Sequence, residues 1–108
     1  MKKIFLSQPM NGLSDDEIFA NRKKAIDEFI IPMGIEFEIL ESFFDDYDPE
    51  AEGIGHPGVA FLGKSLQLLA EADLAVFLPG YELARGCRIE QTVAVEYGIE
   101  TMYIPEWN

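Results

Sequence analysis

The feature that most restricts the fold of this chain is a run of five apolar residues, Leu-Ala-Val-Phe-Leu, at positions 74–78. A strand with water on one face alternates between apolar and polar residues, whereas a strand covered on both faces is apolar throughout. The run ends at the turn residues Pro79 and Gly80, and it therefore predicts a central strand of a parallel sheet. Because parallel strands need helical crossovers, the rest of the chain should alternate strands with helices.

The remaining strands and helices are predicted from apolar spacing and capping signals. Strands are expected at residues 3–6, 35–40 and 101–104, and helices at residues 62–70 and 85–97. A further helix begins at a capping box made by Ser14 and Glu17 and stops before Pro32. The acidic segment 45–58, which also contains glycine and proline, is interpreted as a loop.

The strand pattern also predicts the order of the sheet and the position of a site. Residues 35–40 alternate between apolar and acidic side chains, as an edge strand does, so the expected order is 2-1-3-4 in a four- or five-stranded parallel sheet. Ligands of such sheets bind beyond the carboxyl ends of the strands, where the strand order reverses. That point lies between the first and third strands, next to the loops 8–12 and 79–85.

The composition excludes several classes of function. The net charge of −12, with only eight basic residues, argues against an extended nucleic-acid surface, because phosphate backbones are bound by clustered Lys and Arg. No apolar run approaches the ~20 residues of a membrane helix, and no signal-peptide core is present. Length predicts one domain, residues 1–108. A single cysteine suits a reducing compartment, so the expected location is the cytoplasm.

Glu90 is the strongest candidate for chemistry. It shares a helix stripe with Val93, Ala94 and Tyr97, so it should point toward the sheet. A carboxylate there is costly unless it has partners or faces a cavity, and the nearby helix N-terminus favours its ionised form. It could then act as a nucleophile. The alternative is a solvated glutamate on the helix surface.

Several other side chains have both a functional and a structural interpretation. Arg85 and Arg88 flank the start of the same helix and could hold a phosphate or the Glu90 carboxylate, or they could only solubilise the surface. Arg22 falls on the apolar stripe of the first helix, where we expect its side chain to reach solvent. Cys87 and His56 could form a thiol site, although a lone cysteine is more often a packing residue.

Neither a metal nor a cofactor is predicted. The acidic run that begins at Asp45 is only superficially similar to a calcium loop. Counted from Asp46, the glycine position holds Ala51 and the closing acidic position holds Pro57. The chain also has no glycine-rich phosphate loop of the dinucleotide-binding or Walker type.

Two stretches of the chain resemble the nucleoside 2-deoxyribosyltransferase superfamily. The first is the opening Ile-Phe-Leu-Ser-Gln-Pro-Met-Asn-Gly at positions 4–12. The second is Ala-Asp-Leu-Ala-Val-Phe-Leu-Pro-Gly-Tyr at positions 72–81, followed by Arg-Gly-Cys-Arg-Ile-Glu at 85–90 and by Ala94 and Gly98. Both stretches most resemble a branch that is common in phage and prophage genomes. The similarity spans most of the chain.

The resemblance implies a small flavodoxin-like α/β fold, a three-layer sandwich, in an oligomer whose sites can borrow residues from a neighbour. It also implies an N-glycosidic reaction in which Glu90 attacks the anomeric carbon of a nucleoside. We therefore predict Glu90 as the catalytic residue. The predicted substrate-binding residues are Ser7, Gln8, Pro9, Met10, Asn11, Gly12, Ser65, Gly80, Tyr81, Arg85, Gly86 and Arg88.

This chain departs from the superfamily pattern at three positions. Ser65 stands where the enzymes place an acid that handles the nucleobase proton, and Ala84 stands where they place an Asp or Ser that touches the sugar or phosphate. Thr92 replaces a glycine after the nucleophile. Serine does not act as a general acid near neutral pH.

Three functions are therefore open. The first is an N-glycoside hydrolase or deoxyribosyltransferase-like enzyme, and the second is a protein that sequesters or senses a nucleotide-derived metabolite. The third is a structural protein with a relic pocket. The apolar residues Tyr103, Ile104 and Trp107 near the end of the chain are expected to be exposed, which favours a homodimer or a larger homo-oligomer.

Overall fold

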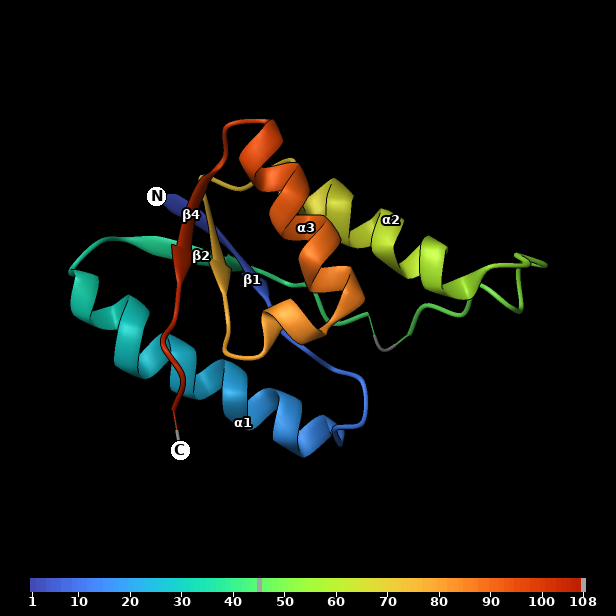
Figure 1. Cartoon of the computed structure of the whole chain (residues 1–108), viewed down its shortest axis with the longest axis horizontal. Coiled ribbons are helices and arrows are strands. Elements are labelled where there is room, and N and C mark those ends of the chain that lie inside the picture. Colours follow the sequence, from blue (N-terminus) through green and yellow to red (C-terminus); the bar gives the residue numbers. More distant parts are fainter. Residues whose placement is uncertain (45, 108) are drawn as a thin grey trace.

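Four strands of the chain pair in parallel and form one sheet in the order β2-β1-β3-β4, as predicted (Figure 1). The computed structural model describes residues 1–44 and 46–107. The strands are β1 (Lys2–Ser7), β2 (Phe37–Leu40), β3 (Leu74–Phe77) and β4 (Glu100–Tyr103). All four residues of β3 are buried, because this strand has a neighbour on each side and helices on both faces.

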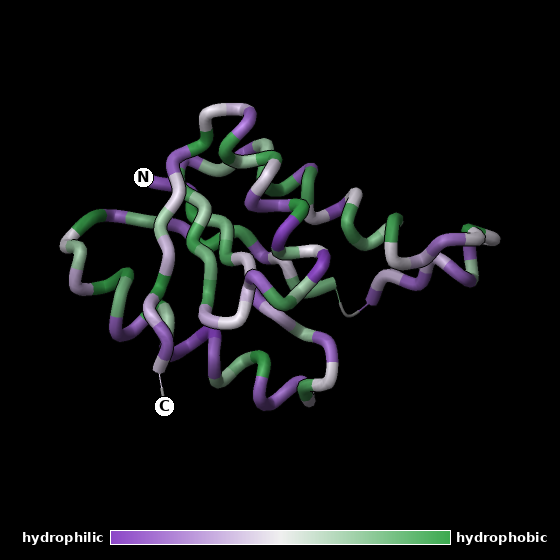
Figure 2. Tube along the Cα trace, viewed as in Figure 1, coloured by the Kyte–Doolittle hydropathy of each residue, from purple (hydrophilic) through white to green (hydrophobic). Residues whose placement is uncertain are grey.

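Helices cover both faces of the sheet and make a three-layer α/β sandwich of the flavodoxin-like kind (Figure 1). They are α1 (Asp15–Ala25), α2 (Pro57–Leu69) and α3 (Arg85–Glu96). Ile4, Leu6 and Val76 pack toward α1, whereas Phe5 and Phe77 pack toward α2 and α3. Successive strand residues point to opposite faces, so the apolar strands supply both cores, and apolar residues concentrate at the centre of Figure 2.

Two helix boundaries differ from the prediction. The first helix does not stop before Pro32, because a π-helical turn (Ile26–Ile30) and a 3-10 turn (Ile31–Met33) continue it until Gly34, whose φ is 69°. Proline is accepted there since it lies at the start of the 3-10 turn, where no backbone donor is required. The second helix begins at Pro57, five residues before the predicted residue 62, within the segment interpreted as loop. Asp45, the first residue of that predicted loop, lies outside the described residues.

Arg22 is buried, so the prediction that its side chain reaches solvent is wrong. The residue is only 9% exposed, and its Nη2 atom donates to the carbonyl of Leu40 at 3.4 Å and lies 3.6 Å from the Glu41 carboxylate. Its place on the apolar stripe of α1 directs it to the sheet. The side chain therefore ties α1 to the carboxyl end of β2 instead of extending into water.

The residues after β4 are also more covered than expected. Ile104 is buried in the core on the α1 side of the sheet. Trp107 packs against the end of α1 and the π-helical turn that continues it, with its ring 6.1 Å from that of Phe29 and 5.1 Å from the Lys24 ammonium group. Tyr103 is exposed as predicted, at 41%, and its ring stacks on Phe77. The expected exposure of Ile104 is therefore wrong, because the chain folds back across α1 after β4.

Candidate functional site

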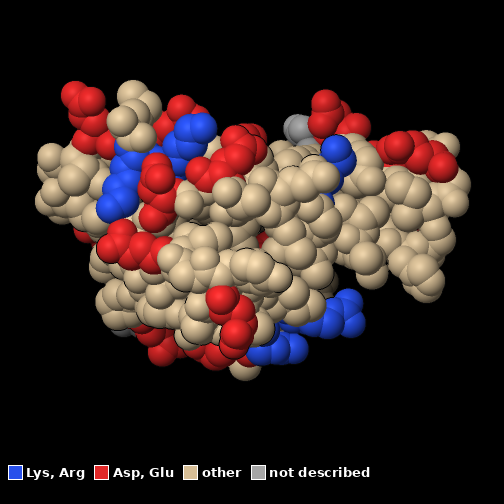
Figure 3. All heavy atoms as spheres, turned by 90° about the horizontal axis from the view of Figure 1, so that it is seen from above, with Lys and Arg blue, Asp and Glu red and all other residues tan. Residues whose placement is uncertain are grey.

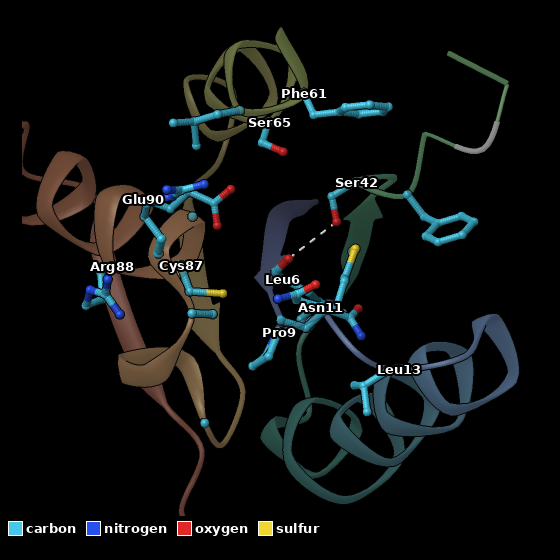
Figure 4. A pocket seen from close by; sticks show the side chains of 18 of the residues that line it. Leu6, Pro9, Asn11, Leu13, Ser42, Phe61, Ser65, Cys87, Arg88 and Glu90 are labelled. Carbon is cyan, nitrogen blue, oxygen red and sulfur yellow. Dashed lines mark hydrogen bonds between the residues drawn. The ribbon is translucent and has the colours of Figure 1, made fainter. Parts of the chain in front are cut away.

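A cavity of about 1090 Å³ opens at the carboxyl ends of β1 and β3, where the reversal of strand order predicts a site. Five segments contribute to its wall: the loops after β1, β2 and β3, one face of α2, and the start of α3. In Figure 4, Phe61 and Ser65 reach the cavity from α2, opposite Pro9, Asn11 and Leu13 of the loop after β1. Glu90 and Cys87 project into it from α3.

Glu90 lies in the wall of this cavity with its carboxylate pointing inward (Figure 4). It is 7% exposed, which excludes the alternative of a solvated surface glutamate. Its Oε1 atom accepts a hydrogen bond from the Ser7 hydroxyl at 2.7 Å, at the carboxyl end of β1. Burial raises the pKa of Glu90 above its ordinary value, while hydrogen bonds from Ser7 and Ser65 partly oppose this rise.

Cys87 lies one helical turn before Glu90 and also lines the cavity. Burial raises the pKa of its thiol to about 11, the hydrogen bond with the Ser7 hydroxyl partly opposes this rise, and the charge of Glu90 adds the smallest contribution, which is also upward. The reactive form of cysteine is the thiolate, so this side chain is protonated at neutral pH. His56 precedes α2, is exposed, and is not among the residues of the cavity wall. The structure gives the Cys87–His56 interpretation no support.

Gln8 contributes a buried amide at the edge of the cavity. It is 6% exposed, and its Nε2 atom donates to the backbone carbonyl of Ile18 at 3.0 Å. This contact fixes the orientation of the amide, because only the nitrogen can donate to a carbonyl oxygen. The Oε1 atom is buried and has no partner among the described residues. Buried polar atoms in proteins are nearly always paired, so this oxygen is an exception close to the cavity.

The two arginines at the start of α3 differ in their surroundings. Both line the cavity. The Nη1 atom of Arg88 donates to the backbone carbonyl of Glu82 at 3.0 Å, which holds this guanidinium against the preceding turn. Arg85 is the first residue of α3 and is exposed. An anion bound there would also meet backbone N–H groups that have no partner within the helix.

The structure brings together most of the residues predicted from the sequence. Those in the cavity wall are Gln8, Pro9, Met10, Asn11, Ser65, Gly80, Arg85, Gly86, Arg88 and Glu90. Ser7 is not part of the wall but contacts Glu90. Gly12 and Tyr81 are not part of it either. Gly12 has a positive φ of 82° in an exposed turn, and the ring of Tyr81 packs instead on Phe77 and Tyr103, at centroid distances of 5.4 and 5.3 Å.

Residues after β2 and early in α2 complete the wall, and none of the sequence patterns predicted that they would do so. Ser42, Phe43 and Phe44 follow β2, and Phe61 lies in the first half of α2. The Ser42 hydroxyl donates to the carbonyl of Leu6 at 3.3 Å, which joins this loop to β1 (Figure 4). The predicted strand order could have indicated these residues. Because β2 is the parallel neighbour of β1, it must end at the same edge of the sheet, where the cavity lies.

The charge around the cavity favours a small ligand. On the face shown in Figure 3, basic side chains lie in small separate groups among acidic ones, without the continuous basic surface that nucleic acid requires.

Across residues 1–44 and 46–107, no three His, Cys, Asp or Glu side chains are grouped as metal ligands. No helix in that part of the chain has the length and apolar character needed to cross a membrane.

Comparison of the chain with protein-family models, with curated proteins and with solved structures finds no match. The assignment of function therefore depends on the geometry of the cavity and on the sequence resemblance.

Proposed function

We propose that this protein binds a nucleoside or nucleotide in the cavity at the carboxyl end of the sheet and acts on its base–sugar bond, with Glu90 as the nucleophile. The observation that carries the proposal is the buried Glu90 carboxylate, directed into the cavity and held by the Ser7 hydroxyl at 2.7 Å. A hydrogen bond from a fixed neighbour orients one oxygen of a carboxylate and leaves the other available for attack. The resemblance to nucleoside 2-deoxyribosyltransferases supports the same role.

In the proposed reaction, a carboxylate oxygen of Glu90 forms a bond to the anomeric carbon of the sugar. The bond from that carbon to the base nitrogen breaks, and the base leaves with the electron pair. Water then attacks the same carbon, which releases the sugar, regenerates the carboxylate and frees a proton that neutralises the departed base. A second base in place of water would give transfer instead of hydrolysis.

A second candidate function is binding without turnover, as in a sequestering or sensing protein. The observation in its favour is Ser65, which contacts Glu90 from α2 where the superfamily places an acid. Without that acid, protonation of a departing base is not assisted. Glu90 would then accept a hydrogen bond from a sugar hydroxyl.

One experiment separates these functions. The protein is incubated with a panel of ribo- and deoxyribonucleosides and their monophosphates, and free base is measured by chromatography. Base release that depends on the protein establishes the enzyme. Binding by calorimetry with no base release over many hours establishes the binder. Absence of both rejects the proposed function.

Arg85 should recognise the phosphate of a nucleotide ligand. We expect Arg85→Ala to weaken monophosphate binding by about 1.5–3 kcal/mol, because a charge-assisted hydrogen bond is lost, and to leave the parent nucleoside nearly unaffected. Calorimetry with both ligands measures the difference. Lys2→Ala is the matched control, since it removes the same charge at the start of β1, away from the carboxyl end of the sheet. Equal losses for nucleoside and monophosphate would assign Arg85 a purely structural role.

The homo-oligomer predicted from the sequence is supported by other exposed apolar residues than those at the end of the chain. Val59, Leu83, Val95 and Tyr97 are more than half exposed, and they lie on or next to the helices α2 and α3. We expect light scattering at micromolar concentration to give at least twice the 12.2 kDa mass of the chain. Val95→Glu and Tyr97→Glu should shift the protein toward the monomer. A monomeric wild type would contradict this prediction.

The sequence also predicts a cytoplasmic location and a phage or prophage origin. We propose an accessory role in nucleotide metabolism that agrees with both.

A further inference from the structure

Within the part of the chain that the structure describes, the cavity wall contains a nucleophile but no second group suited to proton transfer. Among the described residues of the wall, Glu90 is the only Asp, Glu or His. The hydroxyls of Ser42 and Ser65 do not donate protons readily near neutral pH. The thiol of Cys87, whose pKa is raised to about 11 by burial, is also a weak acid. Glu90 cannot be both nucleophile and acid in the same step.

This arrangement restricts the leaving group of the proposed reaction. A purine or pyrimidine that departs from its sugar carries away an electron pair as an anion unless a proton reaches it. A general acid at such a position contributes about 10²–10⁴-fold to the rate, and the wall formed by residues 1–44 and 46–107 holds none. A base that already carries a positive charge at the bonded nitrogen departs as a neutral molecule, and its departure needs no proton.

The cavity also has room and contacts for more than a nucleoside. Its volume of about 1090 Å³ slightly exceeds the range of roughly 300–1,000 Å³ that is common for small-molecule sites. Phe43, Phe44 and Phe61 supply aromatic surface for a ring system from the side of β2 and α2, and Arg85 supplies a cation at the start of α3. A ligand with rings and phosphate fits both regions.

The side-chain amide of Gln8 bears on which polar group the ligand would carry. Its amide orientation is fixed by the hydrogen bond to Ile18, and its buried Oε1 atom has no partner among the described residues. The residue forms part of the cavity wall. The oxygen has almost no accessible surface, so a ligand with an N–H donor, such as a carboxamide, would pair it after a shift of the side chain toward the cavity and would remove the cost of leaving it unpaired.

From these observations we infer that the substrate is an N-ribosylpyridinium nucleotide, the chemical class that contains the nicotinamide nucleotides. This inference rests on the proposed function of Glu90. A carboxylate oxygen of Glu90 bonds to the anomeric carbon, and the bond to the pyridinium nitrogen breaks. The electron pair neutralises the ring, which leaves as a neutral pyridine. Water then attacks the glycosyl ester, which yields the free sugar phosphate derivative, the Glu90 carboxylate and one proton released to solvent.

The test compares charged and neutral leaving groups on the same protein. Nicotinamide mononucleotide, its dinucleotide, and the monophosphates of inosine and deoxyinosine are each incubated with the wild type, and the free base is measured by chromatography. We expect the pyridinium substrates to be cleaved at least about 10²-fold faster in kcat/KM, because they do not need the missing acid. Glu90→Gln should remove this cleavage.

The outcomes separate the inference from the proposed function. Faster cleavage of the inosine substrates would overturn the pyridinium inference and leave the proposed function intact. No cleavage of any substrate would reject both. Ser65→Asp supplies an acid, so it should lower the ratio of kcat/KM for the charged substrates to kcat/KM for the neutral substrates about tenfold or more. Ser65→Asn is the matched control, because it adds a side chain of similar size without an acid. An unchanged ratio in a folded Ser65→Asp variant would contradict the argument from the missing acid.

Gln8 gives a second readout that does not depend on turnover. Gln8→Leu should weaken the binding of nicotinamide mononucleotide to the Glu90→Gln background by about three- to tenfold, through loss of one hydrogen bond. The pyridine mononucleotide without the carboxamide should bind both proteins equally. A loss of the same size for both ligands would mean that Gln8 only supports the fold.

Discussion

Glu90→Gln should keep the fold and the ligand affinity of the protein but lower base release by more than roughly 10³-fold. Glutamine is nearly isosteric with glutamate, but its amide cannot form the glycosyl ester that the proposed reaction requires. The Ser7 hydroxyl can still donate to the amide oxygen in place of Oε1. Chromatographic assay of free base, together with calorimetry, separates the loss of rate from any loss of binding.

The matched control for this variant is Glu96→Gln. Glu96 lies on the same helix, is exposed and is absent from the cavity wall, so its substitution should leave base release unchanged. A 2-fluoro nucleoside should trap a sugar adduct on Glu90 that mass spectrometry detects. If base release survives in Glu90→Ala, the proposed mechanism is wrong and Cys87 becomes the nucleophile to test.

The pH dependence of base release should show an acid limb above the ordinary pKa of a glutamate, 4.5, since burial raises the pKa of Glu90. The nucleophile has to be ionised, so the rate should fall about tenfold for each pH unit below that pKa. Ser7→Ala removes a hydrogen bond that lowers the pKa of Glu90. The variant should therefore move the acid limb to higher pH. An acid limb at 4.5 or below in the wild type would show that Glu90 is not the titrating nucleophile.

The raised pKa of Glu90 also makes the free energy of unfolding depend on pH. Because the folded state binds this proton more tightly than the unfolded state, the stability linked to Glu90 is fully present below pH 4.5. It is lost as the pH rises through the raised pKa of the folded protein. Glu90→Gln removes the buried charge, so it should raise the free energy of unfolding at neutral pH by about 1 kcal/mol. Chemical unfolding of both proteins at pH 4 and pH 7 measures this gain, which should vanish at the lower pH.

The sheet could be predicted because two of its strands carry local patterns that restrict their places in it. The apolar run at residues 74–78 requires cover on both faces, and the alternation at residues 35–40 is tolerated only at an edge. These two facts are sufficient for the order 2-1-3-4. The ends of the helices were less predictable, because Pro32 was expected to end the first helix and Pro57 lay in the segment interpreted as a loop. In the structure they occupy the first positions of a 3-10 turn and of α2, where proline is well accepted.

Three properties of the protein could be predicted from local patterns: the topology, the location of the cavity, and the position of Glu90 on the helix face that points into it. All three follow from local periodicity and from the rule that parallel strands end at one edge. The exposure of each polar side chain could be read only from the folded structure. Arg22 is buried, Tyr81 turns away from the cavity, and Phe43 and Phe61 reach it from segments distant in the chain. Exposure and side-chain direction depend on contacts between such segments, which no local pattern encodes.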